Sequence, residues 1–277
     1  MKAAPFDYLR ARHVEEVVTA LAADDGAKVI AGGQSLVPLM AMRLARPTVL
    51  VDVNDLDLDA VVVTDGELCV GSGTRHQTLE RDAVVGRAAP LFADAAALIG
   101  YPSIRVRGTV GGSLAHADPV AELPAVLVAL GGAVIARGPG GERRIDAAGL
   151  FTGFLSTALE PDELLVEVRV PAAGPAAGAA FREWAPRCGD FALAGVGVHV
   201  ERGPDGTCSS ARAAACGVGT APLDCSEAIE AVLGARDASD ALLRDVARWF
   251  GDRELHGLLA ARALYRALAR ASVDVAA

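Results

Sequence analysis

Apolar residues in the first part of the chain form short uninterrupted runs that alternate with stretches of helical spacing. The segment VEEVVTALAADDG repeats its apolar positions every three to four residues and stops at Gly26, which predicts a helix. The short runs predict strands, because a strand that is buried on both faces needs no polar alternation. We expect a buried strand over residues 27–31 and further strands over residues 48–53, 67–73 and 163–171.

Helical spacing fills the segments between these strands. A short helix is expected over residues 35–45, and residues 78–100 hold further helical segments. Residues 119–130 predict a helix in which Asp118 is the cap and Pro119 takes the first position. The segments AVIAR and RRID flank the glycine-rich GPGGE, so they predict a hairpin.

The composition changes at AAGPAAGAA, residues 172–180, which is the best candidate for a domain boundary. Beyond it, residues 191–201 and 209–219 predict two strands that the turn RGPDGT joins. Three helical segments close the chain, at residues 222–234, 238–251 and 253–271. The pattern therefore predicts an α+β fold with a mixed N-terminal region and a C-terminal domain of strands and helices.

Composition narrows the class of protein. The chain has 277 residues, of which 52% are hydrophobic and only 4% aromatic, so small aliphatic side chains must build the core. A net charge of -9 argues against a nucleic-acid binder, and the short basic segments RVRG and GERR are interpreted as solvated loops. No signal peptide is expected, and Pro124 and Gly131–Gly132 interrupt the most apolar run, so we expect no membrane span.

The cysteines predict no covalent or metal framework. Cys69, Cys188, Cys208, Cys216 and Cys225 are odd in number, scattered and without a CxxC pair. A disulfide scaffold, a zinc site or an iron–sulfur cluster within this chain is therefore not expected. Reduced and mostly buried thiols in a cytoplasmic protein are the simplest interpretation.

Two segments place a double glycine between apolar residues and small polar ones. They are Ala31–Ser35 and Thr109–Ser113. Glycine allows positive φ and a close approach of the backbone to a ligand, and consecutive N–H groups form an anion-binding concavity. A helix start just after the first segment adds a positive dipole end. Two such loops facing one another predict a pyrophosphate site, with further donors in Gln34 and the hydroxyl groups.

Either double glycine alone is more simply explained as a tight turn. The occurrence of two, each followed by polar donors, favours the ligand-binding interpretation. The chain contains no GxxxxGK[ST] and no GxGxxG after a strand. It therefore belongs neither to the P-loop proteins nor to the ordinary Rossmann proteins.

Longer segments around these glycines carry a family resemblance. AGGQSLVPLMAMRLARPTVLVDV, IRVRGTVGGSLAHADPVAELPAVLVAL and GDFALAGVGV resemble the FAD-binding medium subunit of the molybdenum hydroxylases, the flavoprotein subunit of the carbon monoxide dehydrogenase and xanthine dehydrogenase family. The resemblance implies a PCMH-type FAD-binding fold over residues 1–172, with subdomains of about 1–57 and 58–172. It further implies a C-terminal domain over 178–277 with a three-stranded sheet and a helical bundle.

The resemblance also implies which residues contact FAD, with both glycine segments on its pyrophosphate. The predicted contacts are Ala31, Gly32, Gly33, Gln34, Ser35, Leu36, Tyr101, Thr109, Gly111, Gly112, Ser113, His116, Asp118, Glu122, Leu164 and Phe191. Glu122 stands where many relatives have Asp and is expected on the ribityl or ribose hydroxyls, a role that Asp118 shares if it is more than a helix cap. Core packing remains the alternative for Tyr101, Leu164 and Phe191, and a structural role remains the alternative for His116.

The segment EWAPRCGDF departs from the family pattern, which often has a second basic residue there; this change can alter access to the flavin edge. His76 invites comparison with a histidyl-flavin link, but the molybdenum-hydroxylase relatives hold FAD without a covalent bond, so we reject that link. No catalytic residue and no metal ligand is predicted.

The implied function is electron transfer within a larger enzyme. FAD in this chain collects electrons from [2Fe–2S] clusters on a small partner subunit and passes them to NAD⁺, a quinone or O₂, while a large partner carries molybdopterin. A dimer of heterotrimers is the expected assembly. Two alternatives stay open: a free-standing flavoenzyme that oxidises a small molecule directly, and an assembly protein that has kept the fold but lost the flavin.

Overall fold

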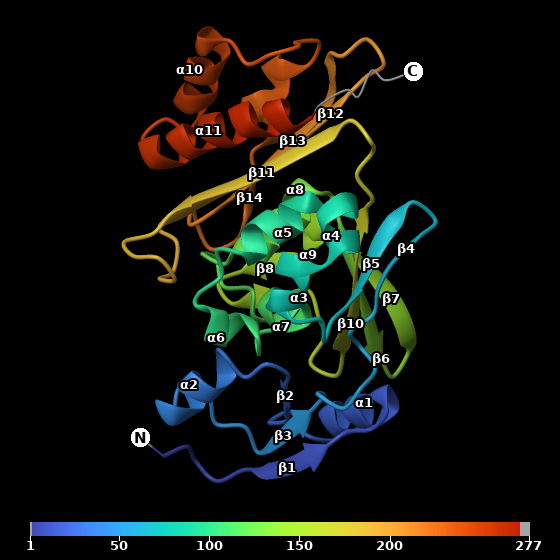
Figure 1. Cartoon of the computed structure of the whole chain (residues 1–277). Helices are drawn as coiled ribbons and strands as arrows, with labels where there is room; N and C mark the ends of the chain where they lie inside the picture. The colour runs from blue at the N-terminus through green and yellow to red at the C-terminus, as the bar shows by residue number, and fades with distance from the viewer. Residues whose placement is uncertain (1, 272–277) are drawn as a thin grey trace.

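Three sheets follow one another along the chain in the computed structural model, which describes residues 2–271. Figure 1 shows the N-terminal sheet at the bottom, the middle sheet and its short helices at the centre, and the C-terminal sheet with its longer helices on top. An isolated pair of very short strands lies beside the middle sheet. Helices and strands are mixed throughout, as the α+β prediction requires.

The N-terminal sheet is parallel and has the strand order β1-β3-β2. Its elements are β1 (Asp7–Arg10), α1 (Val14–Ala23), β2 (Lys28–Ile30), α2 (Leu36–Ala41) and β3 (Val49–Asp52). β1 was not predicted, because it is mostly exposed and carries no apolar run. β2 forms an edge and is only partly buried, so the expectation of a buried strand there is wrong in that respect.

The middle sheet is antiparallel, with the order β4-β5-β10-β6-β7. Its strands are β4 (Val61–Thr64), β5 (Glu67–Gly71), β6 (Ala133–Gly138), β7 (Gly141–Asp146) and β10 (Leu164–Pro171). The accompanying elements are α3 (His76–Arg81), α4 (Ala83–Ala88), α5 (Pro90–Ala96), α6 (Pro102–Arg105), α7 (Val110–His116), α8 (Glu122–Ala129), α9 (Ala147–Leu150), β8 (Phe151–Gly153) and β9 (Ser156–Thr157). The predicted hairpin is formed by β6 and β7, with Gly138 opposite Gly141.

The predicted helix over 119–130 begins three residues late. Glu122 is its first residue and Ala121 precedes it, without a capping side chain. Asp118 instead accepts a hydrogen bond from the Val120 N–H at 3.1 Å, while its carbonyl accepts one from the Ala121 N–H. The prediction of Asp118 as the helix cap is wrong, because a local turn takes up its carboxylate before the helix starts.

The C-terminal sheet has the order β11-β12-β13-β14 and is antiparallel. Its strands are β11 (Ala177–Trp184), β12 (Ala194–Arg202), β13 (Cys208–Cys216) and the two-residue β14 (Leu223–Asp224). The 3₁₀ helix η1 (Ser226–Val232) and the helices α10 (Asp240–Trp249) and α11 (Glu254–Arg270) complete the chain. The three long strands are those of the expected sheet, and β14 adds a short edge.

Three local expectations need correction. β11 begins at Ala177, inside the loose segment 172–180, because Ala and Gly carry no apolar signal even where they are buried in a sheet. The segment 222–234 is not one regular helix but a short strand followed by a 3₁₀ helix. Arg105 in RVRG is buried, not solvated: its guanidinium donates to Glu80 at 2.9 Å and to the carbonyls of Ile99 and Gly100.

Helix α8 joins the middle and C-terminal layers, because every one of its residues is buried. It packs against β12, β13 and β14 on one side and against α5 and α7 on the other. One hydrophobic core contains α8 together with Ala179, Phe181, Ala214 and Cys216 of the C-terminal sheet. The two layers therefore share a core, and the start of α8 lies at the seam between them. No helix within residues 2–271 is both long and apolar enough to span a membrane.

Candidate functional site

The first double glycine forms the turn between β2 and α2. Gly33 has φ +70°, a left-handed conformation that favours glycine. Its carbonyl accepts the first helical hydrogen bond, from the Val37 N–H at 3.1 Å. Within residues 2–271, the N–H groups of Gly33, Gln34 and Ser35 have no hydrogen-bond partner. This turn therefore presents three consecutive free donors at the start of a helix, as an anion site requires.

The second double glycine is not a loop but the first turn of α7. Thr109 caps that helix, and its hydroxyl oxygen accepts from the Gly112 N–H at 3.1 Å. The Val110 and Gly111 N–H groups donate to the carbonyls of Thr74 and Ser72, and the Ser113 N–H donates to the Thr109 carbonyl. Every N–H group of this turn already has a partner in the protein. The expectation of two equivalent N–H cradles is therefore wrong.

The two glycine segments nevertheless meet. A Cβ on Gly32 would overlap the carbonyl oxygen of Arg107, just before the second segment, and would lie 2.8 Å from the Cα of Gly108. Gly32 is buried, whereas Gly112 is exposed and Gly33 is half-buried. The absence of a side chain at Gly32 is thus what allows the β2–α2 turn and the start of α7 to lie side by side.

Two polar side chains that sequence reasoning missed tie the segments together. The Asn54 amide donates to the Ala31 carbonyl at 2.9 Å and accepts from the Arg75 guanidinium at 2.8 Å. Arg75 also donates to the Arg107 carbonyl at 2.6 Å. Burial, and then the nearby Arg107 charge, lower the pKa of Arg75, while Asp59 and Asp52 act in the opposite direction. Asn54 and Arg75 stand in loops without a motif, so no signal in the sequence marks them.

His76 contacts the backbone at the start of the second glycine segment. Its Nε2 lies 2.9 Å from the Thr109 carbonyl oxygen and its backbone N–H donates to the Gly108 carbonyl. A Cβ on Gly108 would lie 2.7 Å from Nδ1 of the same ring. Burial lowers the pKa of His76 to about 4, so the ring is neutral at pH 7 and Nε2 carries the proton that Thr109 accepts. The imidazole is packed against the protein and bonded to it.

The start of α8 carries a carboxyl group without a cation. Glu122 is buried, and burial, then the charges of Glu183 and Asp118, raise its pKa to about 8. Glu183 at the end of β11 has a pKa raised to about 7 by burial, and its Oε2 is buried without a hydrogen-bond partner. Cys216 lies close to both carboxyl groups. Burial, and then the charges of Glu122 and Glu183, raise the pKa of its thiol. Sequence reasoning found Glu122 and Asp118 but missed Glu183.

The predicted flavin-ring contacts are not all brought together. Tyr101 is half exposed, and its ring lies 2.9 Å from the position of a Cβ on Gly189, in the loop that joins β11 and β12. Phe191 belongs to the same loop and is 73% exposed. Leu164 lies instead in the core of the N-terminal layer, with Val17 among its neighbours. Its position favours core packing, and its contact with the flavin stays a prediction without support from the structure.

The remaining predicted contacts lie along the two glycine segments. The Gln34 amide donates back to the Gly32 carbonyl at 3.0 Å. Ser35 precedes α2 and is exposed, and Leu36 is the first residue of that helix. Gly111 is packed against Ser72, which a Cβ would approach to 2.5 Å. Ser113 and His116 are half-buried on α7.

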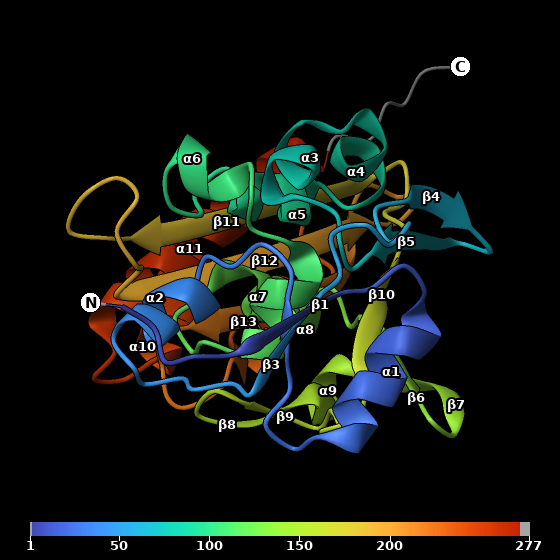
Figure 2. The same cartoon turned by 90° about the horizontal axis from the view of Figure 1, so that it is seen from below.

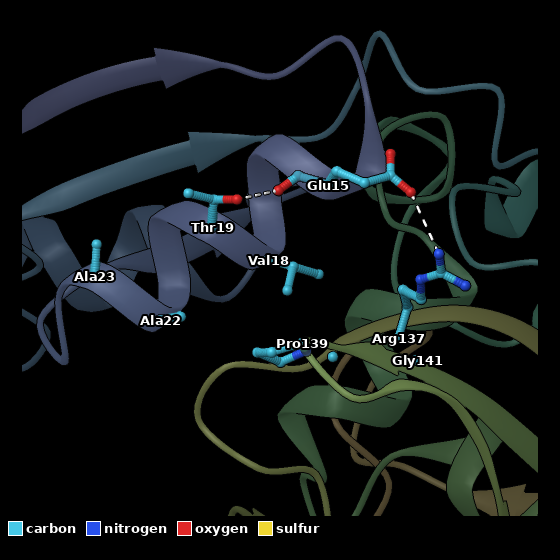
Figure 3. A pocket seen from close by; sticks show the side chains of 9 residues that line it. Glu15, Val18, Thr19, Ala22, Ala23, Arg137, Pro139 and Gly141 are labelled. Atoms are coloured by element: carbon cyan, nitrogen blue, oxygen red, sulfur yellow. Dashed lines mark hydrogen bonds and ion pairs between the residues drawn. The ribbon is translucent and has the colours of Figure 1, made fainter.

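A pocket lies elsewhere on the protein. It is lined by α1 and the β6–β7 hairpin, with Glu15, Val18 and Thr19 on one side and Arg137 and Pro139 on the other (Figure 3). Figures 1 and 2 both place α1 away from α2, at the opposite end of the N-terminal layer. The walls of this pocket are mainly apolar, and Arg137 and Glu15 of its lining form an ion pair at 3.4 Å. None of the predicted FAD contacts lines this pocket.

Comparison with known proteins agrees with this geometry. The family described as the FAD binding domain in molybdopterin dehydrogenase matches residues 4–173, which contain both glycine segments. The protein is a member of this family. It is an FAD-binding subunit of the molybdenum hydroxylase type of dehydrogenase, and the resemblance noted from the sequence is confirmed.

Similar proteins include the subunit alpha of the 6-hydroxypseudooxynicotine dehydrogenase complex of Paenarthrobacter nicotinovorans, which is 42% identical over 87% of this chain and 83% of that protein. Caffeine dehydrogenase subunit beta of Pseudomonas sp. strain CBB1 is 38% identical over 80% of this chain and 76% of that protein. A chain of carbon monoxide dehydrogenase from Hydrogenophaga pseudoflava superimposes with a TM-score of 0.92 and 33% identity, over 98% of this chain and 100% of that chain. This match confirms the predicted fold.

FAD fits the residues of this family member. The turn at Gly33–Ser35 supplies free donors for an anion, and Gly33 keeps the approach open. The unpartnered carboxyl oxygen of Glu183 and the buried Glu122 need hydrogen-bond donors, which the hydroxyl groups of FAD can supply. Within the described residues, no group of three His, Cys, Asp or Glu side chains is arranged to hold a metal ion.

Proposed function

We propose that the chain is the electron-transfer subunit of a heterotrimeric molybdenum hydroxylase. FAD supplies the redox chemistry, and the protein holds it and shields it. Electrons come from [2Fe–2S] clusters of a small partner subunit, molybdopterin resides on a large partner, and NAD⁺, a quinone or O₂ is the acceptor. A cytoplasmic dimer of heterotrimers is the proposed assembly. The observation that carries the proposal is the set of free N–H groups at Gly33–Ser35 beside the capped start of α7.

The predicted residues, apart from His116 and Leu164, have a proposed part in holding FAD. The backbone from Ala31 to Leu36 receives the pyrophosphate, while Thr109 to Ser113 closes the other side with the exposed surface of Gly112. Glu122 and Asp118 are assigned to hydroxyl groups, and Tyr101 and Phe191 to the isoalloxazine ring. The buried, protein-bonded ring of His76 supports non-covalent attachment of the flavin. The domain limits 1–172, with subdomains of about 1–57 and 58–172, and 178–277 are retained as part of this proposal.

The similar proteins support a relay, not a substrate-selecting subunit. One belongs to caffeine dehydrogenase and others to carbon monoxide dehydrogenases, whose named substrates share no chemical group. Chains that are 38% and 34% identical to the present one thus belong to enzymes named for caffeine and for carbon monoxide. The simplest explanation is that another subunit selects the substrate. The substrate of this complex is therefore not assigned from this chain.

The proposed docking face for the iron–sulfur partner is the surface from Tyr101 to Arg107. Tyr101 and Val106 are about half exposed there, and Arg107 is exposed as well. Arg105 does not contribute, because its guanidinium is buried on Glu80. An apolar surface with one peripheral cation is suited to a protein interface. Co-purification from the native source, with subunit and metal analysis, tests this assembly.

Two experiments test the flavin and its role. Acid precipitation of the purified holoprotein is expected to leave all flavin in the supernatant, and flavin retained on the denatured chain would contradict non-covalent binding. In anaerobic stopped-flow experiments, purines, aldehydes or carbon monoxide are expected not to bleach the flavin of the chain alone, and the two partner subunits are expected to restore bleaching. Rapid bleaching of the lone chain by an organic substrate favours the free-standing flavoenzyme, and failure to bind FAD at all favours an assembly protein.

A further inference from the structure

The seam between the middle and C-terminal layers holds two carboxyl groups that come from distant parts of the chain. Glu122 is the first residue of α8, and Glu183 is the penultimate residue of β11. The register of the sheet places Glu183, Gly195 and Cys216 in one row across β11, β12 and β13. Phe181 and Cys216 belong to the core shared with α8, so this face of the sheet is the one that α8 covers. Glu183 therefore points to the layer that contains Glu122.

The protein leaves both carboxyl groups short of hydrogen-bond donors, because within residues 2–271 only its own backbone N–H bonds to Glu122. Glu122 is 8% exposed, and no other residue in the described range 2–271 donates a hydrogen bond to it. The Oε2 atom of Glu183 is buried and unpartnered. No Lys, Arg or His pairs with either group in the described part of the chain. Such an arrangement is costly unless a donor from outside the chain completes it.

The other titratable groups at the seam cannot complete it. Asp118 precedes α8 and adds further negative charge. The thiol of Cys216 is kept neutral, because burial raises its pKa, and it is at best a weak donor. His256 on α11 is committed to the carbonyl oxygen of Cys216 at 3.0 Å. The missing donors therefore come from outside the chain, from a ligand or from ordered water.

The geometry points to a shared role. We propose that Glu183 contacts FAD together with Glu122, and that the two carboxyl groups hold one proton between them while they bind the cofactor's sugar-like hydroxyl groups. This inference rests on the proposed function, and it adds Glu183 as a binding residue. A hydroxyl group both donates and accepts, so it satisfies a carboxylate and a protonated carboxyl group at the same time.

The position of the pair agrees with an extended cofactor. Helix α7 has seven residues and begins at the second glycine segment, so it is about 10 Å long, at about 1.5 Å per residue. The turn after α7 leads directly to Glu122. A ligand whose pyrophosphate lies at the glycine segments can thus reach the seam with its polyol chain. The ribityl chain and the adenosine ribose share this chemistry, and the experiment separates them.

The test is FAD affinity as a function of pH, measured by titrating the full-length apoprotein and following flavin fluorescence. From about pH 6 to about pH 9, the Kd of the unaltered protein is expected to rise roughly tenfold, as the shared proton is lost and two like charges face each other. Glu183→Gln and Glu122→Gln are expected to flatten this profile to within about threefold, because an amide cannot lose a proton there. The matched control is Glu230→Gln, on the exposed face of η1, with an unchanged profile.

Two further arms identify the contact. Glu183→Ala is expected to raise the Kd roughly tenfold at about pH 6, and Glu183→Gln to restore it to within about threefold. An FAD analogue without a ribityl hydroxyl group should bind less tightly to the unaltered protein but not to Glu183→Ala, whereas the same pattern with an adenosine-deoxy analogue would place the contact on the ribose. If Glu183→Ala does not fold, the profile of Glu183→Gln decides alone.

The outcomes separate this inference from the proposed function. If the unaltered protein binds FAD and Glu183→Gln keeps its full pH dependence, Glu183 is only a buried acid and the inference is overturned. If both deoxy analogues lose the same affinity in Glu183→Ala as in the unaltered protein, the inference is likewise overturned. If the unaltered, folded protein binds no FAD at all, the proposed function fails with it.

Discussion

The two double glycines share a sequence pattern but differ in what their backbones offer. At Gly32–Gly33 the chain turns into α2 through a positive φ and leaves three consecutive N–H groups without partners in residues 2–271. At Gly111–Gly112 the same dipeptide is helical, and Ser72 and Thr109 accept the hydrogen bonds of its two N–H groups. The first is a donor cradle. The second glycine pair allows α7 to pack closely against its neighbours and leaves Gly112 exposed on the surface.

The difference shows that Gly-Gly alone does not define an anion site. Glycine removes the steric barrier to close approach, but the neighbouring backbone decides whether a ligand or the protein approaches. A Cβ on Gly32 or Gly111 would overlap atoms of Arg107 or Ser72, whereas Gly33 is half-buried and Gly112 is exposed. Within each pair, one glycine is packed against the protein, and the other is the one that we propose to face the ligand.

The largest effect is expected from Gly33→Val. A β-branched residue at φ +70° is strained, and its side chain covers the free N–H groups, so the Kd for FAD should rise by roughly 500-fold. Fluorescence titration measures this, with circular dichroism to verify folding. Gly86→Ala is the control, since a Cβ there meets no atom within 4 Å, and it should leave the Kd unchanged. Equal affinity of Gly33→Val and the unaltered protein would reduce the first segment to a simple turn.

The contribution of His76 to the free energy of unfolding is expected to depend on pH. His76 has an ordinary pKa of 6.5 and a folded pKa of about 4, so the unfolded chain takes up the proton first as the pH falls. Its contribution to stability is complete above about pH 6.5 and is lost on the way down to about pH 4, by on the order of 3 kcal/mol.

Chemical denaturation at several pH values checks this prediction. His76→Gln retains a donor for the Thr109 carbonyl but cannot titrate, so it should lose less free energy of unfolding than the unaltered protein between about pH 6.5 and about pH 4. Acidic side chains contribute equally to both proteins and cancel in the difference. Parallel pH profiles would show that the His76 ring is not held neutral by burial.

Gly112→Val tests whether the second glycine segment binds FAD in the same way as the first. Its Cβ would lie 2.8 Å from the Thr109 hydroxyl oxygen and disturb the helix cap, but no free N–H group is lost. A cap is worth about 1 kcal/mol, and the new side chain narrows the ligand side, so the Kd for FAD should rise roughly tenfold. The titration used for Gly33→Val measures it. An effect as large as that of Gly33→Val would mean that both segments bind FAD in the same way.

Arg75→Gln is expected to have the smallest effect. It removes the link between Asn54 and the Arg107 carbonyl, so the two segments are held less firmly, and the Kd should rise about fivefold, or about 1 kcal/mol. Arg244→Gln on the exposed side of α10 is the charge-matched control. A Kd that does not change in Arg75→Gln would show that Gly32 packing alone fixes the spacing of the segments.

Local patterns in the sequence predicted several strands, one helix and the family of this protein. The apolar runs located β3, β5 and β10, the helical spacing located α1, and the two glycine segments with their flanks identified the family. These features are local: a strand or an amphipathic helix needs only its own pattern, and a turn needs only its own glycine. Glu122 and Asp118 were predicted as FAD contacts from the family resemblance, and these contacts stay predictions.

Which groups of those segments are free to bind a ligand depends on contacts that form only in the folded chain. Whether an N–H group is free depends on residues far away in sequence, such as Ser72 and Thr74 for the start of α7. Arg75, His76 and Glu183 stand in no motif that predicts their contacts, and their roles follow from burial against Arg107, Thr109 and α8. β1 and β11 escaped prediction because exposed or Ala-rich strands carry no apolar signal. Pairing and desolvation are properties of the packed chain, so no local pattern can encode them completely.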